Sequence, residues 1–236
     1  MLSLIFSDKT QESSSPGESH PLAGIKVSIE VLKNELDLEQ DDKEIFLRII
    51  NEINRIESLL KHLLNYARPS KPRPASVSIH EILEGLIKTS EFSFKRTKGA
   101  SGMIKDINFA KDFDSYIPEI CADPGQLQQV FLNLILNATD AIREQGTISI
   151  KTAGTPGGSV EIRISDTGQG IDPKALGMVF NPFFTSKSKG TGLGLAICKR
   201  LIEQQGGTIS ALNNPEGGAT FVVTLPVKNK NKKCEP

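Results

Sequence analysis

Two successive apolar stripes near the start of the chain constrain its fold more than any other feature. Leucine and isoleucine recur at intervals of three and four residues from Leu22 to Leu36, and a second stripe of the same kind runs from Ile45 to Leu63. This spacing places apolar side chains along one face of a helix. Because only a short polar break separates the stripes, residues 20–68 are predicted to form a hairpin of two antiparallel helices.

A helical hairpin of this kind cannot bury its apolar stripe alone. Two copies that pair into a four-helix bundle would cover it, so the sequence predicts a homodimer. The alternative is that the hairpin packs against the remainder of its own chain.

A proline-rich segment divides the chain. Residues 68–74 read RPSKPRP, with three prolines in seven residues, and proline both interrupts helices and stiffens linkers. We therefore expect a linker at residues 69–76 and a second domain at residues 77–228. The polar residues 1–19 are predicted to be a flexible lead-in, and residues 229–236 a charged tail.

The second domain mixes helical and strand patterns. Strands beside a few long helices indicate an α+β fold, an α/β sandwich with helices on one face of a mixed sheet. Helices are expected at residues 79–88, 125–144 and 192–205, and strands at residues 147–152, 160–166, 207–213 and 219–227.

Composition narrows the class of protein. Lys plus Arg and Asp plus Glu both number 28, so the net charge is zero, which argues against a nucleic-acid binder. No apolar stretch has the length of a membrane span. Cys121, Cys198 and Cys234 are far apart without a CxxC pair, which predicts no disulfide framework, no zinc site and a cytoplasmic location. Cys198 falls in a helical pattern and is expected to pack as a small hydrophobe.

The first block with chemical meaning is NLILNA at residues 133–138. Asn133 and Asn137 are four residues apart and so share one helical face. Their amide oxygens could hold a hard cation and, through it, phosphate oxygens. The alternative is a solvated or capping pair of asparagines.

The second block is a strand that runs into a glycine-spaced turn at residues 162–171. Asp166 at the strand end can accept a hydrogen bond from an exocyclic amine. Gly168 and Gly170 remove side chains that would keep a flat ligand away from the backbone. Taken alone, the pattern could also be a simple turn.

The third block, VFNPFFTSK at residues 179–187, is followed closely by Lys189. Its aromatic side chains could anchor a loop whose outer part moves, and Lys187 and Lys189 could meet phosphate charge. The alternative is a hydrophobic turn with solvated lysines.

The fourth block, Gly190-Thr191-Gly192-Leu193-Gly194, opens the next helix. Exposed N–H groups and the helix dipole favour anions at such a start. The block does not follow the first strand of a βαβ unit and has no Walker lysine pattern, so Rossmann and P-loop folds are excluded.

In this order and spacing, the four blocks resemble the N, G1, F and G2 boxes of the GHKL ATPases, which include histidine kinases, gyrase-type topoisomerases, Hsp90 chaperones and mismatch-repair proteins. The closing GGATFVVTLP at residues 217–226 resembles the last strand of the histidine-kinase branch. With a hairpin upstream, that branch is the best match, and the resemblance covers residues 20–227. It implies a dimeric helical hairpin followed by an ATP-binding α/β sandwich.

The resemblance also implies ATP and Mg²⁺ as cofactors and a role for each box. Asp166 would bind the adenine amino group with support from Thr220. Asn137, with Asn133 beside it, would hold Mg²⁺ against the triphosphate. The phosphates would be met by a short lid between Phe184 and Gly190 and by the helix start that follows it. The residues concerned are Lys187, Lys189, Gly190, Thr191, Gly192, Leu193 and Gly194.

The expected acceptor histidine departs from the family pattern. That pattern reads His-Glu-x-x-Asn/Thr-Pro-Leu, whereas this chain has Ser19-His20-Pro21-Leu22. An ungapped alignment puts Pro16 at the acceptor position and His20 at the Asn/Thr position. With four residues removed, His20 lies about one helical turn from the usual place.

Neighbouring residues bear on whether His20 can act. Pro21 favours the first helical position, which puts His20 at the helix start, and Glu18 is the nearest substitute for the missing acidic general base. His62 is expected at a surface or interface, and His80 at a helix start.

Two functions follow. The first is a two-component histidine kinase that autophosphorylates on His20 and passes the phosphoryl group to an aspartate of a response-regulator receiver domain. The second is an ATP-binding dimeric regulatory module without a usable acceptor histidine. A topoisomerase or chaperone ATPase is disfavoured, because no transducer domain follows the last strand.

Overall fold

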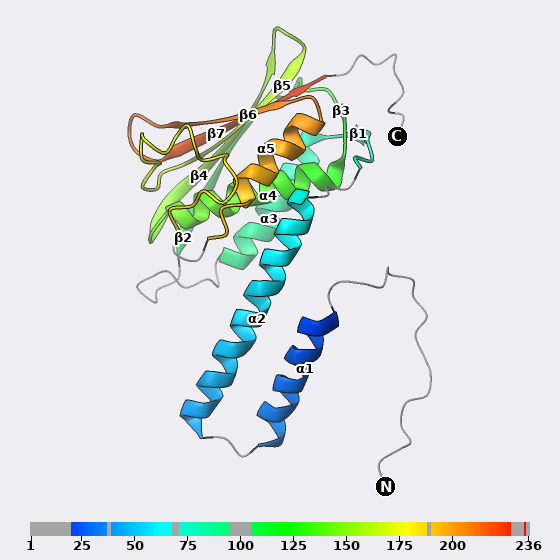
Figure 1. Cartoon of the computed structure of the whole chain (residues 1–236). Helices are drawn as coiled ribbons and strands as arrows, with labels where there is room; N and C mark the ends of the chain where they lie inside the picture. The colour runs from blue at the N-terminus through cyan, green and yellow to red at the C-terminus, as the bar shows by residue number, and fades with distance from the viewer. Residues whose placement is uncertain are drawn as a thin grey trace. The chain divides into compact units, whose positions relative to one another are not determined.

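A computed structural model describes residues 20–36, 39–67, 71–94, 105–187 and 190–227, and residue 234. The chain divides into two compact units, Met1–Lys61 and His62–Pro236 (Figure 1). The predicted lead-in lies outside the described residues. So does the predicted tail, apart from Cys234.

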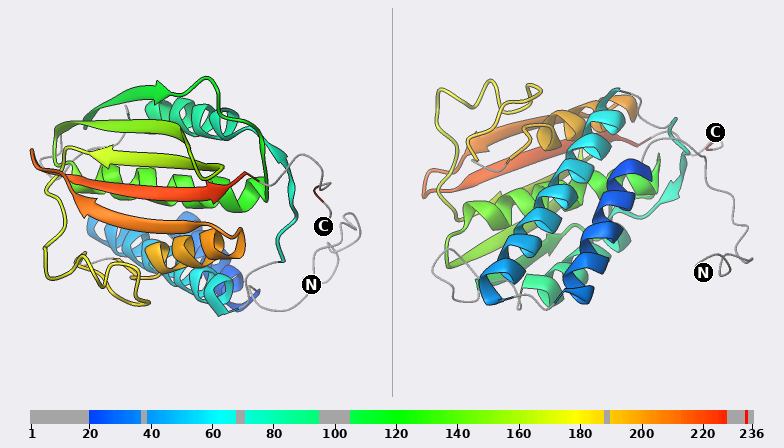
Figure 2. Two further views of the ribbon diagram at one scale, coloured as in Figure 1. Left: turned by 90° about the horizontal axis from the view of Figure 1, so that it is seen from above. Right: turned by 60° about the horizontal axis from the view of Figure 1, so that its bottom comes forward.

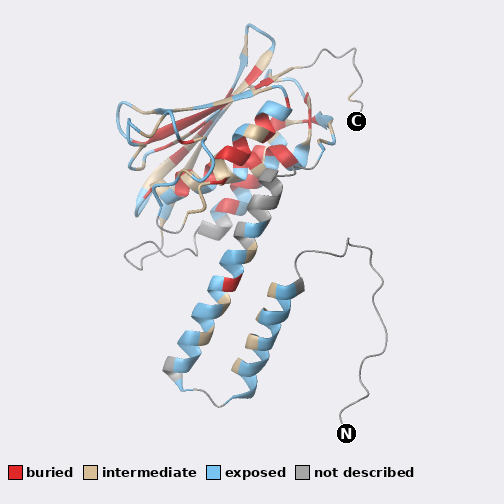
Figure 3. Ribbon diagram, viewed as in Figure 1, coloured by how far each residue is buried: buried red, intermediate tan, exposed pale blue. Residues whose placement is uncertain are grey.

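The first unit contains the predicted helical hairpin except for the last turns of its second helix, which belong to the second unit. Helix α1 spans His20–Glu35 and helix α2 spans Gln40–Ala67, so both stripes fold as helices. Figure 3 shows that most of the hairpin surface is exposed. Ile53 is buried, and Leu22, Ile29 and Ile50 are half-buried. Ten large aliphatic residues of the two helices are 40–58% exposed, namely Ile25, Val27, Val31, Leu32, Leu36, Ile45, Leu47, Ile49, Ile56 and Leu60.

The second unit is built on a mixed sheet. Its strand order is β2-β4-β5-β7-β6, in which β2 is parallel to β4 and the other neighbours are antiparallel. The strands span Asp106–Phe113 (β2), Gln145–Thr155 (β4), Ser159–Asp166 (β5), Thr208–Asn213 (β6) and Ala219–Pro226 (β7); a separate antiparallel pair joins β1 (Ala75–Val77) to β3 (Ile120–Ala122). The α+β prediction is confirmed.

Three helices cover one face of this sheet, as Figure 2 shows from above. They are α3 (Ile79–Phe94), α4 (Pro124–Ala141) and α5 (Gly194–Gln204). Alternate residues of the central strands point toward them, and the helices supply a stripe of their own. The fully buried core includes Leu127, Phe131, Leu134 and Ile135 of α4 with Ile148, Ile150, Ile162 and Ile164 of the sheet.

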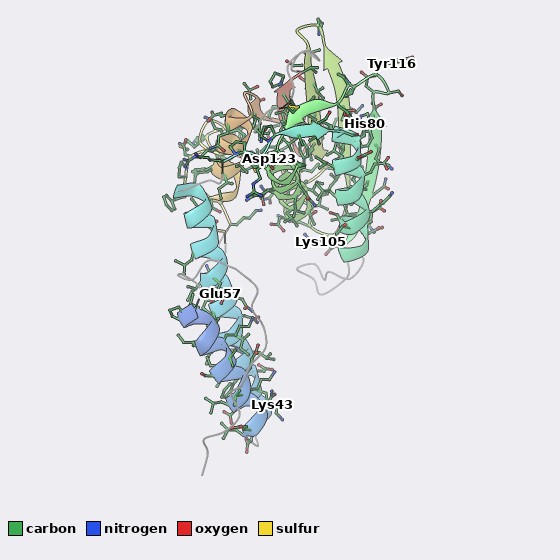
Figure 4. All side chains as sticks on the ribbon, turned by 90° about the vertical axis from the view of Figure 1, so that its right-hand side faces the viewer. Lys43, Glu57, His80, Lys105, Tyr116 and Asp123 are labelled. Atoms are coloured by element: carbon green, nitrogen blue, oxygen red, sulfur yellow. A yellow bond between two sulfur atoms is a disulfide. The ribbon has the colours of Figure 1, made fainter. Side chains whose placement is uncertain are left out.

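Helix α4, which carries the predicted asparagine pair, is held at both ends. Asp123 caps its start by accepting a backbone N–H at 3.0 Å, and Pro124 occupies the first turn, where its missing N–H costs nothing. At the other end, Lys105 Nζ donates to the carbonyls of Thr139 and Ile142, each at 2.8 Å. Figure 4 labels Asp123 and Lys105.

Three strands were not predicted. Strands β1 and β3 have only three residues each, too few for a period-2 pattern. Strand β2 reads DINFAKDF with an irregular burial pattern, so it lacks the strict alternation by which a half-buried strand is predicted. Helix α4 also ends three residues earlier than expected, at Ala141, and β4 begins directly afterwards at Gln145.

His80 lies in the first turn of α3, as predicted for a helix-start residue. Its Nε2 is 3.0 Å from the Thr152 hydroxyl, and its ring stacks on Phe113 with centroids 4.9 Å apart. These contacts join α3 to strands β2 and β4 and give His80 a structural role.

The cysteines follow the prediction only in part. Cys198 is fully buried, and burial raises its pKa to about 12, as suits a packing residue. Cys121 and Cys234, however, form a disulfide with Cα atoms 5.7 Å apart. The expectation of no disulfide was wrong because the two residues are 113 positions apart, and cysteine spacing rules detect local pairs.

Candidate functional site

Asp166, the predicted adenine contact, is the last residue of β5. Its side chain is only 3% exposed. Oδ1 accepts the backbone N–H of Gly168 at 2.8 Å and that of Ala219 at 3.4 Å, while Oδ2 accepts no hydrogen bond from the described residues. Burial raises the pKa of this carboxyl, and the two N–H groups oppose the shift. A buried oxygen without a donor is costly unless a ligand supplies one.

A polar network fixes the backbone of Asp166 from behind. Asn214 Nδ2 donates to the Asp166 carbonyl at 3.0 Å, and the Thr220 hydroxyl donates to Asn214 Oδ1 at 2.5 Å. Thr220 also contacts the Ser165 hydroxyl at 2.7 Å. Thr220 therefore supports Asp166 through Asn214, a residue that sequence analysis missed because it lies in a Pro-Glu-Gly-Gly turn and resembles an ordinary turn former.

The glycine turn after Asp166 packs against the end of α4. A Cβ at Gly168 would lie 2.5 Å from the carbonyl carbon of Ala141, and Gly170 has a φ of 73°, a conformation that glycine adopts readily. The sequence pattern suggested ligand access as the reason for these glycines, whereas the structure gives each a further reason: packing against α4 for Gly168 and a positive φ for Gly170. A hollow of about 670 Å³ opens here, lined by residues 141–145 and 167–169.

The two asparagines of α4 have different surroundings. Asn133 lies beside the buried Cys198 thiol of α5 and opposes the rise in the pKa of that thiol, so it is placed at the contact between the two helices. Asn137 is partly exposed, and its Oδ1 accepts a hydrogen bond from Lys187 Nζ at 2.9 Å. Of the pair, Asn137 is the residue with an oxygen directed at the lid.

Lys187 contacts a second group on α4. Its Nζ lies 2.8 Å from Asp140 Oδ2. Sequence analysis missed Asp140, although a position three residues after Asn137 on a helix predicts a shared face. Lys189, the other predicted phosphate contact, lies outside the described residues.

The glycine block bends the chain into α5. Gly192 has a φ of 68°, and a Cβ there would collide with the backbone of Phe183. Thr191 accepts the Leu193 N–H at 3.2 Å, and Leu193 is buried. Helix α5 then begins at Gly194 without a side-chain cap, so its first N–H groups are available to an anion.

The turns and the lid meet on the last turns of α4. Gly168 packs against Ala141, while Lys187 reaches Asn137 and Asp140. The Gly190 N–H donates a hydrogen bond to the Lys187 carbonyl at 3.1 Å. His20 is the first residue of α1, followed by Pro21, as the proline predicts; its side chain lies outside the described residues.

Two sequence families match the chain. The family described as histidine kinase-, DNA gyrase B-, and HSP90-like ATPase matches residues 122–229, and the His Kinase A (phospho-acceptor) domain matches residues 20–72. Together they cover more than half of the chain. The chain belongs to the histidine kinase family.

Curated relatives and a solved structure agree with this assignment. The histidine kinase core is 32% identical over 216 residues to the sensor histidine kinase ZraS of Klebsiella oxytoca, covering 90% of this chain and 44% of ZraS. It is 32% identical over 223 residues to the sensory histidine kinase/phosphatase NtrB of Rhodobacter capsulatus, covering 89% of this chain and 59% of NtrB. The chain thus spans about half the length of these relatives.

Among solved structures, full-length ShkA in complex with AMPPNP superimposes with a TM-score of 0.72 at 27% identity, covering 87% of this chain and 43% of ShkA. The match confirms the fold of the histidine kinase core. None of the helices in the described part of the chain has the length and apolar content that a bilayer crossing requires.

Proposed function

We propose that this histidine kinase core binds Mg-ATP between the glycine turn, the last turns of α4 and the lid, autophosphorylates on His20 and passes the phosphoryl group to a response-regulator aspartate. The observation that carries the nucleotide site is Asp166. Its buried Oδ2 has no donor among the described residues, and the amino group of adenine is a donor that would satisfy it.

The other residues fit the phosphate end of the nucleotide. The uncapped start of α5 offers N–H groups to the phosphates, and Lys187 is a lid cation within reach of the same helix face as Asn137. Gly190, Gly192 and Gly194 keep this segment free of bulky side chains, with Thr191 and Leu193 between them.

The donor chemistry also fits Mg²⁺. No cluster of three His, Cys, Asp or Glu side chains occurs within the residues that the structure describes. Mg²⁺ is commonly held by one or two protein oxygens together with substrate phosphates, and Asn137 supplies such an oxygen. When bound, Mg²⁺ would neutralise charge that develops on the phosphates.

The proposed phosphoryl transfer uses His20, which belongs to the first unit. An imidazole nitrogen of His20 would attack the γ-phosphorus as ADP leaves. The labile N–P bond would then allow transfer to a carboxylate of a receiver domain. We further propose that the hairpin dimerises, because its stripe residues are exposed in a single copy and a four-helix bundle would bury them.

A second function is supported by the position of His20. It is the first residue of α1 and precedes Pro21, so it lacks the following acidic residue that the family pattern provides. The second candidate is therefore an ATP-binding dimeric regulatory module that docks partners without phosphorylating itself.

Incubation with γ-labelled ATP and Mg²⁺ distinguishes the two functions. We expect acid-labile, base-stable label on the wild-type chain and none on His20→Gln, with His62→Gln as the matched control that keeps its label. If wild type binds ATP but takes up no label, the kinase proposal is contradicted and the regulatory module is supported.

A further inference from the structure

The lid lysine, Lys187, contacts two side chains of α4. Lys187 Nζ donates to Asn137 Oδ1 at 2.9 Å and to Asp140 Oδ2 at 2.8 Å. The ammonium group thus lies on the oxygen that we assign to Mg²⁺. One amide oxygen cannot serve the lysine and a metal ion in the same way, so the two cations compete.

From this competition we infer that Asp140 and Lys187 form an inhibitory latch, which holds the lid on α4 and opposes nucleotide binding. The inference rests on the proposed function of the site. Asp140 supplies the charge that retains the lysine, and Asn137 supplies the oxygen that the lysine blocks.

The latch has the strength expected of a reversible device. The side chains of Lys187 and Asp140 are 45% and 58% exposed, and exposed ion pairs are weak because water and salt screen them. With a weak latch, the apparent association constant for nucleotide equals the intrinsic constant multiplied by the fraction of molecules in which the latch is open. Binding is therefore weakened but not prevented.

Release of the latch also changes the role of the lysine. Once Lys187 leaves Asn137 and Asp140, its ammonium is free to pair with phosphate. The two partners of one ion pair therefore act in opposite directions. Asp140 opposes nucleotide binding. Lys187 blocks the Asn137 oxygen while it is paired with Asp140, and it contacts the phosphates once that pair is broken.

The nucleotide affinities of four proteins, each comprising residues 1–236, test this assignment: wild type, Asp140→Asn, Lys187→Gln and the double variant. Calorimetry with AMPPNP and Mg²⁺ should show that Asp140→Asn tightens binding about two- to fivefold. Lys187→Gln should not tighten it. In the Lys187→Gln background, Asp140→Asn should have no further effect, because there is no lysine left to retain.

The matched control is Asp112→Asn. Asp112 pairs with Lys151 on neighbouring strands at 3.0 Å, with both side chains more than half exposed. The substitution removes the same charge from a comparable ion pair away from the lid, and the affinity should stay unchanged.

A zero-length carbodiimide cross-link provides a readout independent of affinity. The reagent joins a carboxylate to an amine that contacts it. Without nucleotide, mass spectrometry should find Asp140 joined to Lys187, and Mg-AMPPNP should reduce that product. The Asp112–Lys151 product should form equally in both conditions.

Other results would overturn the latch. Equal tightening by Asp140→Asn in both backgrounds would mean that Asp140 simply repels the phosphates. Weaker or unchanged binding would mean that Asp140 does not restrain the lid, as would a cross-link that never forms or that persists at saturating nucleotide. If no protein bound nucleotide, the proposed function would fail and the latch with it, whereas binding without an Asp140 effect would overturn the latch alone.

Discussion

At the scale of single residues, the proposed site contains groups whose surroundings leave them something to gain from a ligand. Asp166 is buried with a raised pKa, and Lys187 is held by oxygens that a metal and a triphosphate would otherwise use. Binding residues commonly carry such a cost, because interactions that satisfy a group fully before binding leave little to gain from the ligand. The residue-scale predictions therefore separate binding from stability.

Asp166→Asn is expected to weaken AMPPNP binding about 10- to 100-fold, the range for loss of a hydrogen bond to a charged group. Calorimetry measures it. Asp172→Asn is the control, because it makes the same change at an exposed position in the same loop. Equal affinities for Asp166→Asn and wild type would refute the adenine role.

The same substitution should not destabilise the fold at neutral pH. Because the Asp166 pKa is raised in the folded protein, the folded state binds this proton more tightly than the unfolded state. Stability from that preference is present below the ordinary carboxyl pKa of 3.8 and is lost as pH rises through the folded value. The melting temperature of Asp166→Asn relative to wild type should therefore rise with pH across this window. A constant difference would contradict the argument.

At the scale of elements, helix α4 and the hairpin differ in how far their apolar faces are buried. Helix α4 has both ends fixed and its apolar face fully buried, so it can hold Asn137 in one place. The hairpin helices expose their stripes, which a monomeric soluble protein rarely does over so long a surface. A second copy would cover them, and this expectation can be tested at single positions.

Leu32→Asp or Ile56→Asp should raise the dissociation constant of the dimer at least about tenfold, since each would bury a charge in the proposed bundle. These side chains are 47% and 40% exposed in the single chain, so the monomer itself should tolerate them. Light scattering over a dilution series measures the change, and Asn34→Asp on an exposed position is the control. Unchanged dimerisation would show that other residues form the interface.

At the scale of the whole molecule, the proposed nucleotide site and the proposed dimer interface lie in different units. The sheet unit has a continuous core built from α3, α4, α5 and the five strands, and the described residues of the proposed nucleotide site all belong to it. The hairpin unit carries His20 and the exposed stripes. The units are therefore expected to be separable in solution.

Deletion of residues 1–68 should leave a monomer that binds AMPPNP within about threefold of the full chain, a difference below 1 kcal/mol. Light scattering reports the mass and calorimetry reports the affinity. A truncated protein that remains dimeric would overturn the assignment of dimerisation to the hairpin. Loss of binding would show that the site needs the hairpin.

Local patterns in the sequence determined much of this protein. The 3–4 spacing of apolar residues specified α1 and α2, alternation specified β4, β5 and β6, and a short apolar run specified β7, because these patterns involve only neighbouring residues. The four blocks of the site were visible for the same reason. Strand β2 was not, since its buried and exposed residues do not alternate regularly.

Only the tertiary structure decided which groups meet. Asn214 supports Asp166 across 48 positions, Lys187 reaches Asp140 across 47, and Cys121 meets Cys234 across 113. It also separated Asn133, which lies beside Cys198, from Asn137, which accepts a hydrogen bond from Lys187. Periodicity constrains residues within one element, but the packing of several elements on a shared core sets the contacts between them, and these long-range contacts give the site its chemistry.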